Sequence, residues 1–342
     1  MKKRMLSKIA MALALLLLIS ACASPAAPAP PPATPEQPEA TMPRVGTMFS
    51  IPDPRNAGGW DRAQMAGFDV LTNAGWHVSV AEDVPYPMIS NTVLNFIDMG
   101  YDMIIYPDAG MMDSFMTLPY DNPDTWFIMA SIVEEIPNLP NVAAFSPDFV
   151  EYGKVVGLMA GAATETGHVG IIGGSPVPIL QNVFSGVIEG VRYVNPDAEV
   201  TVLWAGDWTD TARHREITQM LVDSGVDILF TITGPADHGV YEVAESTGAL
   251  VIGYTWDMFD ANPGAFLTSL LIDTPRLFQE ILDDFNNGTL TNTITPLGRE
   301  YFRLADFRGS VSPEVEAEIR DLVDRFIRGE IYVPLIIHDI MN

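Results

Sequence analysis

Two tryptophans stand in segments that could hold a small molecule. Trp60 follows a pair of glycines, Gly58 and Gly59, in the segment PDPRNAGGW, and Trp208 lies in the segment GDWTD. Glycine allows the backbone to turn sharply and to approach a ligand without a side chain in the way. An indole offers a broad flat surface on which a planar ring can stack. The two segments predict a site that clamps a flat ring, although each tryptophan could instead only pack against the following helix.

Three aspartates and a histidine occur in comparable segments. Asp108 and Asp257 each follow a short apolar run. A carboxylate there could accept a hydrogen bond from an amino group or a ring N–H, or could instead cap a turn. Asp237 and His238 are the one plausible acid–base pair in a segment of this kind. For that pair, a contact with a polar ligand and an ordinary surface position are the alternatives.

The chain lacks the motifs of common enzymes and metal sites. The segment GGSP at residues 173–176 has neither the second glycine of a nucleophile elbow nor the lysine of a phosphate loop. The histidines show no metal-ligand spacing; they are His77, His168, His214, His238 and His338. We therefore predict a protein without catalytic residues, a metal ion or another cofactor.

Residues 1–21 have the organisation of an export signal. Basic side chains come first, followed by an apolar run from Ile9 to Ile19 that is short for a membrane span. The run ends in ISAC, which resembles a bacterial lipobox with its cysteine at the cleavage point. We predict that the chain is exported, cut before Cys22 and held at the membrane only by lipid on that thiol. A plain signal peptide with an incidental cysteine is the alternative. Residues 22–43, rich in proline and alanine, predict an extended tether.

The composition limits the possible partners. Cys22 is the only cysteine, which excludes an intramolecular disulfide and a cysteine zinc cluster. Four of the 18 Lys and Arg residues lie in residues 1–21, which leaves 14 against 44 Asp and Glu residues and a net charge of −30. Such a charge repels nucleic acid and phosphate-bearing ligands, and it suits a neutral or cationic small molecule.

Short β-rich runs alternate with helix-length segments from residue 44 onwards. The helix-length segments are Gln64–Asn73, Thr92–Met99, Glu151–Glu165, Ile179–Val194, Thr211–Ser224 and Gly239–Ser246. The pattern occurs twice, with a change near residues 146–151, and predicts two doubly wound α/β lobes with parallel sheets. Ligands of such sheets bind beyond the carboxyl ends of the strands. The candidate strands are Val45–Ser50, Trp76–Ala81, Met103–Tyr106, Trp126–Ile132, Val142–Phe145, Val169–Ile172, Val200–Leu203, Ile228–Ile232, Val251–Tyr254 and Leu267–Leu271.

Several longer segments resemble a known family. They are GGWDRAQMAGF, EYGKVVGLMAGAATETGHVGIIGGSPVP, GVRYVNPDAEVTVLWAGDWTD, DILFTITGPADHGVYEVAESTG, VIGYTWDM and LTSLLID. Together they resemble the basic-membrane-protein lipoproteins, which are substrate-binding components of ABC importers, several of them for purine nucleosides or bases. The resemblance covers nearly all of residues 44–335. It implies a small-molecule ligand, with the permease and the ATPase as separate proteins.

The resemblance also implies a type I periplasmic-binding fold, in which two lobes are joined by crossover segments. The N-terminal lobe would comprise residues 44–147 and 272–300, and the C-terminal lobe residues 148–271 and 301–342. The hinge would lie near Ser146–Asp148 and Leu271–Asp273.

The same resemblance assigns roles to individual residues. Trp60 matches an aromatic position that stacks on the purine, Trp208 matches the opposing aromatic position, and Asp108 falls near a carboxylate that reads the edge of the base. The remaining expected ligand contacts are Asn56, Gly59, Gly234 and Asp257.

Departures from the family pattern bear on the ligand. Thr255 and Ile272 stand where nucleoside-binding members tend to carry an aspartate and a lysine for the ribose, which favours a bare base. Asp148 adds a carboxylate that could favour a donor-rich or cationic ligand.

We therefore predict a lipid-anchored substrate-binding protein of an ABC importer that binds a purine base, adenine-like, or a nucleoside between two lobes. The alternatives are an extracytoplasmic sensor for a membrane receptor, a nucleoside hydrolase that uses Asp237 and His238, and a binding protein for sugars or other metabolites.

Overall fold

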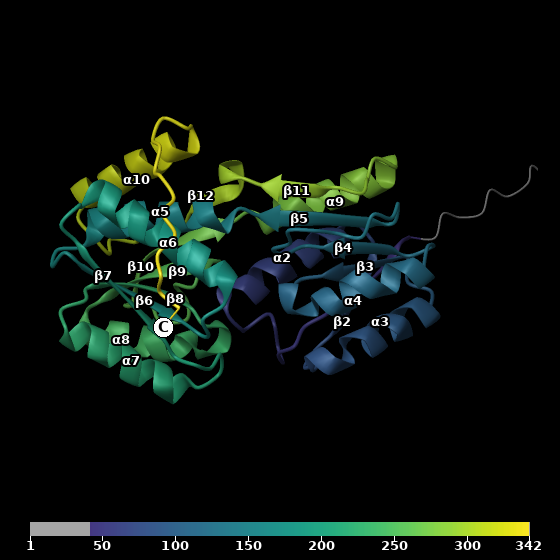
Figure 1. Cartoon of the computed structure of the whole chain (residues 1–342), viewed down its shortest axis with the longest axis horizontal. Coiled ribbons are helices and arrows are strands. Elements are labelled where there is room, and N and C mark those ends of the chain that lie inside the picture. The colour runs from purple at the N-terminus through teal and green to yellow at the C-terminus, as the bar shows by residue number, and fades with distance from the viewer. Residues whose placement is uncertain (1–41, 342) are drawn as a thin grey trace, which may run out of the picture. The chain divides into compact units, whose positions relative to one another are not determined.

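The computed structural model describes residues 42–341, which fold into two α/β lobes (Figure 1). The predicted signal peptide, the lipidation site at Cys22 and most of the predicted tether lie outside the described residues. No helix within the described part of the chain is long and apolar enough to cross a membrane.

The first lobe is built on a six-stranded sheet in which every strand pairs in parallel with its neighbours. In spatial order its strands are β11 (Ile294–Leu297), β5 (Val142–Pro147), β4 (Trp126–Met129), β3 (Met103–Tyr106), β1 (Arg44–Met48) and β2 (His77–Ala81). Helices α2 (Gly59–Asn73) and α9 (Thr274–Asn287) pack on one face, and α3 (Ile89–Asp98) and α4 (Met112–Thr117) pack on the other. The sheet is therefore buried on both sides, as its apolar strands require.

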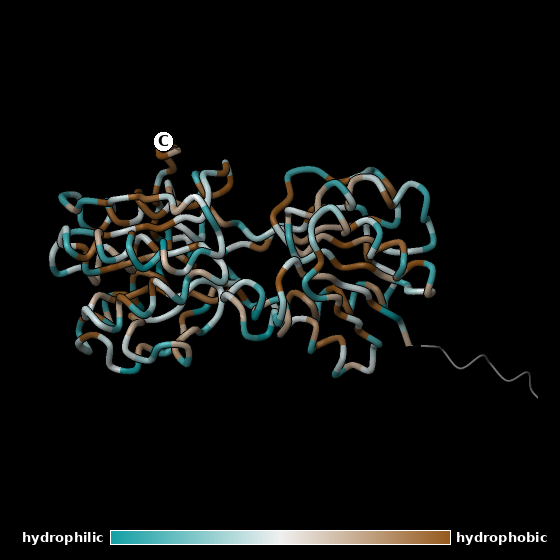
Figure 2. Tube along the Cα trace, turned by 90° about the horizontal axis from the view of Figure 1, so that it is seen from below, coloured by the Kyte–Doolittle hydropathy of each residue, from teal (hydrophilic) through white to brown (hydrophobic). Residues whose placement is uncertain are grey.

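The second lobe repeats this plan with one antiparallel strand at the edge. In spatial order its strands are β12 (Phe302–Leu304), β10 (Phe266–Ile272), β9 (Leu250–Thr255), β8 (Ile228–Ile232), β6 (His168–Gly173) and β7 (Glu199–Trp204). One face carries α5 (Phe149–Ala163), α6 (Pro178–Val194) and α10 (Pro313–Ile327), and the other carries α7 (Thr211–Asp223) and α8 (Asp237–Thr247). Figure 2 shows apolar residues along the central strands of both sheets. The two-lobed α/β fold predicted from the sequence is confirmed.

Helices α5 and α6 approach each other unusually closely, because glycines face the contact. A Cβ at Gly157 would lie 2.1 Å from the carbonyl oxygen of Val187, and one at Gly153 would lie 2.2 Å from that of Val183. Only glycine fits at such backbone separations. The close packing fixes α5, whose first residue, Phe149, enters the site described below.

The chain passes between the two sheets three times, after β5, after β10 and after β11. Hydrogen bonds join these crossings: the Asp148 amide donates to the Leu297 carbonyl oxygen at 3.0 Å, and the Asp273 amide donates to the Tyr301 carbonyl oxygen at 2.9 Å. The carboxylate of Asp148 caps α5, so this added acidic group serves the start of a helix.

Candidate ligand-binding site

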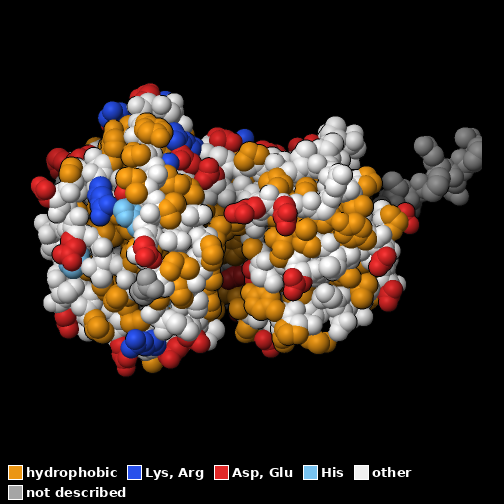
Figure 3. Space-filling model, viewed as in Figure 1, with side chains coloured by type: hydrophobic (Ala, Val, Ile, Leu, Met, Phe, Trp, Pro, Cys, Tyr) orange, Lys and Arg blue, Asp and Glu red, His pale blue; other side chains and the backbone are white. Residues whose placement is uncertain are grey.

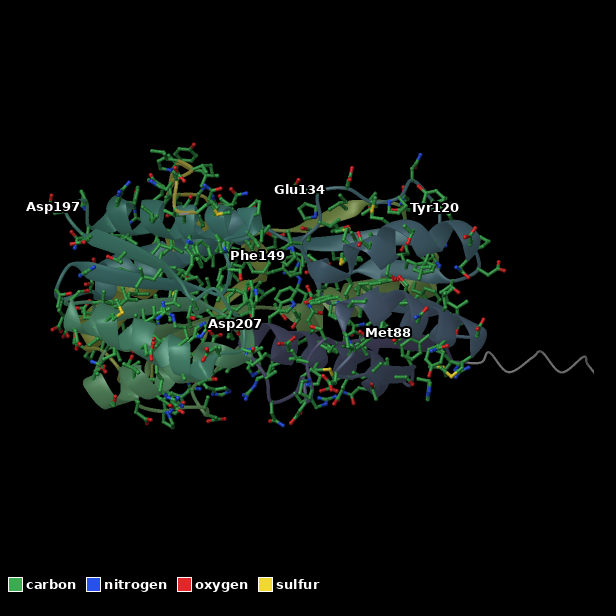
Figure 4. All side chains as sticks on the ribbon, turned by 60° about the horizontal axis from the view of Figure 1, so that its bottom comes forward. Met88, Tyr120, Glu134, Phe149, Asp197 and Asp207 are labelled. Carbon is green, nitrogen blue, oxygen red and sulfur yellow. The ribbon has the colours of Figure 1, made fainter. Side chains whose placement is uncertain are left out.

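A cavity of about 680 Å³ lies between the two lobes, where the carboxyl ends of strands from both sheets meet. We call it the central cavity; Figure 3 shows its opening as a groove between the lobes. Doubly wound sheets place their ligands at this edge, and the volume is within the range of small-molecule sites. Phe149 lies between the lobes in Figure 4 and is part of the lining.

Trp60 lines the central cavity from the first turn of α2. Its Nε1–H donates to the Pro107 carbonyl oxygen at 2.8 Å, which fixes the orientation of the indole. The indole also lies against the ring of Phe149 from the second lobe, with centroids 5.6 Å apart and planes inclined by 56°. Trp60 is thus held by contacts from both lobes.

Trp208 lines the cavity from the second lobe and keeps 39% of its surface exposed. Its ring lies over Gly174, where an added Cβ would come within 2.5 Å of the indole. The loop is fixed by Asp207, whose Oδ1 accepts hydrogen bonds from the backbone and hydroxyl of Thr209 and from the Asp210 amide. Those bonds lower the pKa of Asp207. The two predicted tryptophans therefore border one cavity from different lobes.

Gly59 contacts the backbone of the second lobe, in addition to lining the cavity. The sequence predicted that its backbone approaches a ligand, and Gly59 does line the cavity. A Cβ at Gly59, however, would lie only 1.8 Å from the carbonyl oxygen of Tyr254 in the second lobe. Gly58 in turn packs against Gly234, with 3.2 Å between its would-be Cβ and the Gly234 carbonyl oxygen. The glycine pair therefore allows the two lobes to touch at the edge of the site.

Two of the lining carboxylates are held by neutral donors. The hydroxyl of Tyr86 donates to Asp108 at 2.5 Å, and the Gly110 amide donates to its other oxygen at 2.8 Å. Burial and the charge of Asp108 raise the pKa of Tyr86 to about 12. Asp237, which is 2% exposed, accepts at Oδ1 from the hydroxyls of Thr231 and Thr233. Burial raises the pKa of Asp237, and those hydrogen bonds only partly offset it.

Asp61 is a third lining carboxylate, and it was not among the residues predicted from the sequence. Burial raises its pKa to about 7, and the charges of Asp108 and Asp237 add to the shift. The signal available in the sequence was its place directly after Trp60, at the start of the same helix. Phe149 and Tyr254 were also missed, since each reaches the cavity from an element that carries no obvious ligand motif.

Three residues named from the sequence are not part of the cavity lining. Asn56 is exposed and donates to Asp53 at 2.9 Å. Asp257 is bound by both terminal nitrogens of Arg308, at 2.5 and 3.3 Å. His238 packs its ring edge-on against Tyr241, while Asp237 beside it points to the threonines. The described side chains therefore do not assemble the acid–base pair considered for a hydrolase.

We expect Asp257→Asn to leave ligand affinity within about twofold of the unchanged protein. The Asp257 carboxylate is occupied by Arg308 on a partly exposed surface, where such a pair contributes about 0–1 kcal/mol. Isothermal titration calorimetry of the purified variant checks this. A loss of affinity above about tenfold would show that the loop reaches the ligand.

Comparison with known proteins decides the family. The pattern of the Bmp family, described as ABC transporter substrate-binding protein PnrA-like, matches residues 66–298. The chain belongs to the Bmp family. As a family member it is a substrate-binding protein of an ABC transporter, which implies a small-molecule ligand, permease and ATPase partners and an extracytoplasmic location.

Similar proteins align with different portions of this Bmp-family chain. A CD4+ T-cell-stimulating antigen of Listeria monocytogenes is 24% identical over 361 residues, covering 98% of this chain and 99% of that protein. An ABC transporter nucleoside-binding protein of Lactococcus lactis is 23% identical over 358 residues, with the same two coverages. A purine-binding protein of Brucella abortus is 28% identical over 172 residues, covering 50% of this chain and 48% of that protein.

A solved structure matches most of this Bmp-family chain. The crystal structure of a transcriptional activator of the comK gene from Bacillus halodurans has a TM-score of 0.71 and 23% identity, covering 85% of this chain and 99% of that one. At this identity the match supports the shared fold alone.

Proposed function

We propose that this protein, anchored by lipid on Cys22, captures a purine base, adenine-like, or a nucleoside and delivers it to its importer. The observation that carries the proposal is the central cavity itself. Both lobes contribute aromatic walls to it, Trp60 from the first and Trp208 from the second. A planar heterocycle fits between such walls because every base has a π-face on which an indole can stack.

Polar groups near the walls can select the edge of the base. Asp108 already accepts two hydrogen bonds, but a carboxylate has about four acceptor positions. An exocyclic amino group or a ring N–H of the ligand can therefore still donate to it. Gly59 and Gly234, without side chains, leave the ligand access to backbone groups at the rim of the cavity.

Lobe closure would complete the capture. The three joined crossings restrict the lobes to rotation about one narrow region. Closure would enclose the ligand and form the surface offered to the permease, while Gly58 and Gly59 already lie against the backbone of the second lobe. The names of the Lactococcus lactis and Brucella abortus relatives, which bind nucleosides and purines, support this ligand class.

We expect Trp60→Ala and Trp208→Ala each to weaken purine binding by about 1–3 kcal/mol, because each removes one stacking surface. A thermal-shift screen of bases, nucleosides and sugars identifies the ligand, and calorimetry on that ligand measures the loss. Tyr332→Ala is the matched control, because Tyr332 is an aromatic side chain that is 78% exposed and does not line the cavity. Wild-type affinity in both tryptophan variants would place the ligand elsewhere, and a response only to sugars would replace the purine assignment.

The hydrolase alternative predicts a different result. A binding protein leaves adenosine and inosine intact after long incubation, whereas a nucleoside hydrolase releases free ribose. Chromatography of the incubated nucleosides separates the two. The sensor alternative is tested by uptake: loss of the protein abolishes import of the ligand only if the protein serves a permease.

A further inference from the structure

We propose that the central cavity selects a planar heterocycle that carries a positive charge, such as an N-alkylated purine cation, over the neutral base. The inference rests on the proposed function in taking the central cavity as the ligand site, and it adds the charge of the ligand.

Apart from two tyrosines, the titratable side chains that line the central cavity are all carboxylic acids. They are Asp61, Asp108 and Asp237, and within residues 42–341 the lining includes no lysine, arginine or histidine. Figure 3 shows acidic atoms deep in the groove between the lobes. A site for a phosphate-bearing or carboxylate ligand is typically lined by cationic side chains instead.

Two of these carboxylates accept hydrogen bonds from neutral donors and not from cationic side chains. Glu151, for comparison, is bound by both Arg299 and Lys154. Asp108 and Asp237 accept their hydrogen bonds from hydroxyl and amide donors. Neutral donors orient a carboxylate without cancelling its charge.

Burial raises the pKa of Asp237, and buried His214, whose Nδ1 lies 2.7 Å from the Asp210 carbonyl oxygen, offsets this rise only in part. Burying charge is costly unless an opposite charge arrives. A cationic ligand supplies that charge on binding.

The remaining walls suit a delocalised cation. The aromatic lining consists of Trp60, Tyr86, Phe149, Trp208 and Tyr254. A cation near the face of an aromatic ring is attracted by the ring quadrupole, most strongly when both are shielded from water. A flat cationic ring would gain both stacking and this attraction between the two indoles, whereas a neutral ring would gain stacking alone.

A second hollow beside the central cavity is also lined by acidic residues. It shares Ala109, Ile132 and Ile179 with the central cavity and has a volume of about 730 Å³. Its only charged lining residues among those described are Glu134 and Glu135, and Figure 4 labels Glu134. An approaching cation therefore meets negative potential beside the central cavity, which raises its local concentration.

The test compares cationic ligands with neutral ligands of similar shape, one of which also matches the cation in size. Calorimetry is run with adenosine, with 1-methyladenosine, whose ring is cationic at neutral pH, and with N6-methyladenosine, which carries the same extra methyl group without charge. A second pair, 1-methylnicotinamide with a cationic ring and neutral nicotinamide, is not purine. We expect the cation to bind about tenfold or more tightly than its neutral partners. Its affinity should also fall when salt rises from about 50 to about 500 mM, because salt screens the attraction.

Variants then assign the preference to the cavity. Asp61→Asn and Asp108→Asn should each reduce the ratio of cation to neutral affinity about tenfold. Asp124→Asn, which removes an exposed acidic group away from the cavity, should leave that ratio unchanged.

Each outcome bears on a different claim. Equal or tighter binding of the neutral purines overturns the inference and leaves the proposed function intact. If no purine binds but 1-methylnicotinamide binds and nicotinamide does not, the purine assignment fails and the charge inference stands. If neither pair shows a preference, or if Asp124→Asn lowers the ratio as much as the cavity variants do, the inference is wrong.

Discussion

Gly59→Ala is expected to reduce ligand affinity by about 100-fold or more while the protein stays folded. The added Cβ would lie 1.8 Å from the Tyr254 carbonyl oxygen, well inside any real contact distance, and the obstacle is backbone that no side-chain rotation can remove. The lobes must then stay apart at this edge. Both walls of the central cavity depend on that approach, because Trp60 follows Gly59 directly in the chain. A loss of about 2.7 kcal/mol corresponds to the expected factor.

The neighbouring glycine offers the control for this experiment. A Cβ at Gly58 would meet the Gly234 carbonyl oxygen at 3.2 Å, which a shift of a few tenths of an ångström relieves. Gly58→Ala should therefore bind within a few-fold of the unchanged protein. Small-angle scattering with saturating ligand measures the lobe separation, and Gly59→Ala should keep a larger radius of gyration. If Gly59→Ala binds normally and compacts normally, the lobes do not close on this contact.

Asp61→Asn should stabilise the ligand-free protein above neutral pH and should have little effect near pH 4. Burial, with the charges of Asp108 and Asp237, raises the pKa of Asp61 to about 7 from a usual value of 3.8. Between those two values the folded protein binds a proton that the unfolded chain has released. Stability therefore falls as the pH rises from about 4 to about 7. Asparagine removes this loss, which we expect to be about 2–4 kcal/mol at about pH 8.

Chemical denaturation of both proteins at about pH 4.5 and about pH 8 measures the difference. The groups that face Asp61 are Asp108 after β3, Asp237 at the start of α8, and the tyrosines Tyr86 and Tyr254. Asp124→Asn, an exposed position, serves as the charge-matched control and should show no pH-dependent gain. An Asp61→Asn variant that is equally or less stable than the unchanged protein at the higher pH would contradict the buried, uncompensated carboxylate.

Local sequence was sufficient for the repeated core of the fold. Each of the ten candidate strands corresponds to an observed strand, because most of these parallel strands are short, buried apolar runs. The strands β11 and β12 were missed for physical reasons. Strand β11 contains Pro296 and lies at a sheet edge, and β12 has only three residues and pairs antiparallel to β10. Each of these strands pairs with a strand that is distant in the sequence, and no local pattern encodes such pairing.

Two long helices were missed although their pattern was present. Helix α10 buries Ile319, Val323 and Phe326, which have the spacing of one helical face. Helix α9 buries two adjacent pairs, Leu277 with Phe278 and Ile281 with Leu282, four residues apart. Both helices follow the last predicted strand, and the helical periodicity beyond that strand did not enter the prediction.

Only part of the candidate site could be predicted from the sequence. Trp60, Asp108 and Trp208 follow three different strands, and the rule that ligands bind at strand ends was enough to place them together. Asp257 satisfied the same rule, yet Arg308, 51 residues further along, binds its carboxylate. Phe149 reaches the cavity because the chain crosses into the second lobe just before it. Long-range pairing and the direction of a crossover are both properties of the folded chain.

Helix α9 and strand β11 belong to the first lobe but come after most of the second lobe in the chain, and this order affects how the protein folds during translation. Helix α9 covers one face of the first sheet, where Phe278 lies against Gly67 of α2, and β11 completes its edge. Until residues beyond 274 emerge, Phe68 and Met65 lack the cover that α9 provides, although most of the first lobe has been made. A nascent chain of this protein therefore exposes apolar surface of α2 until α9 has been made, and helper proteins that shield such surface should associate with it until then.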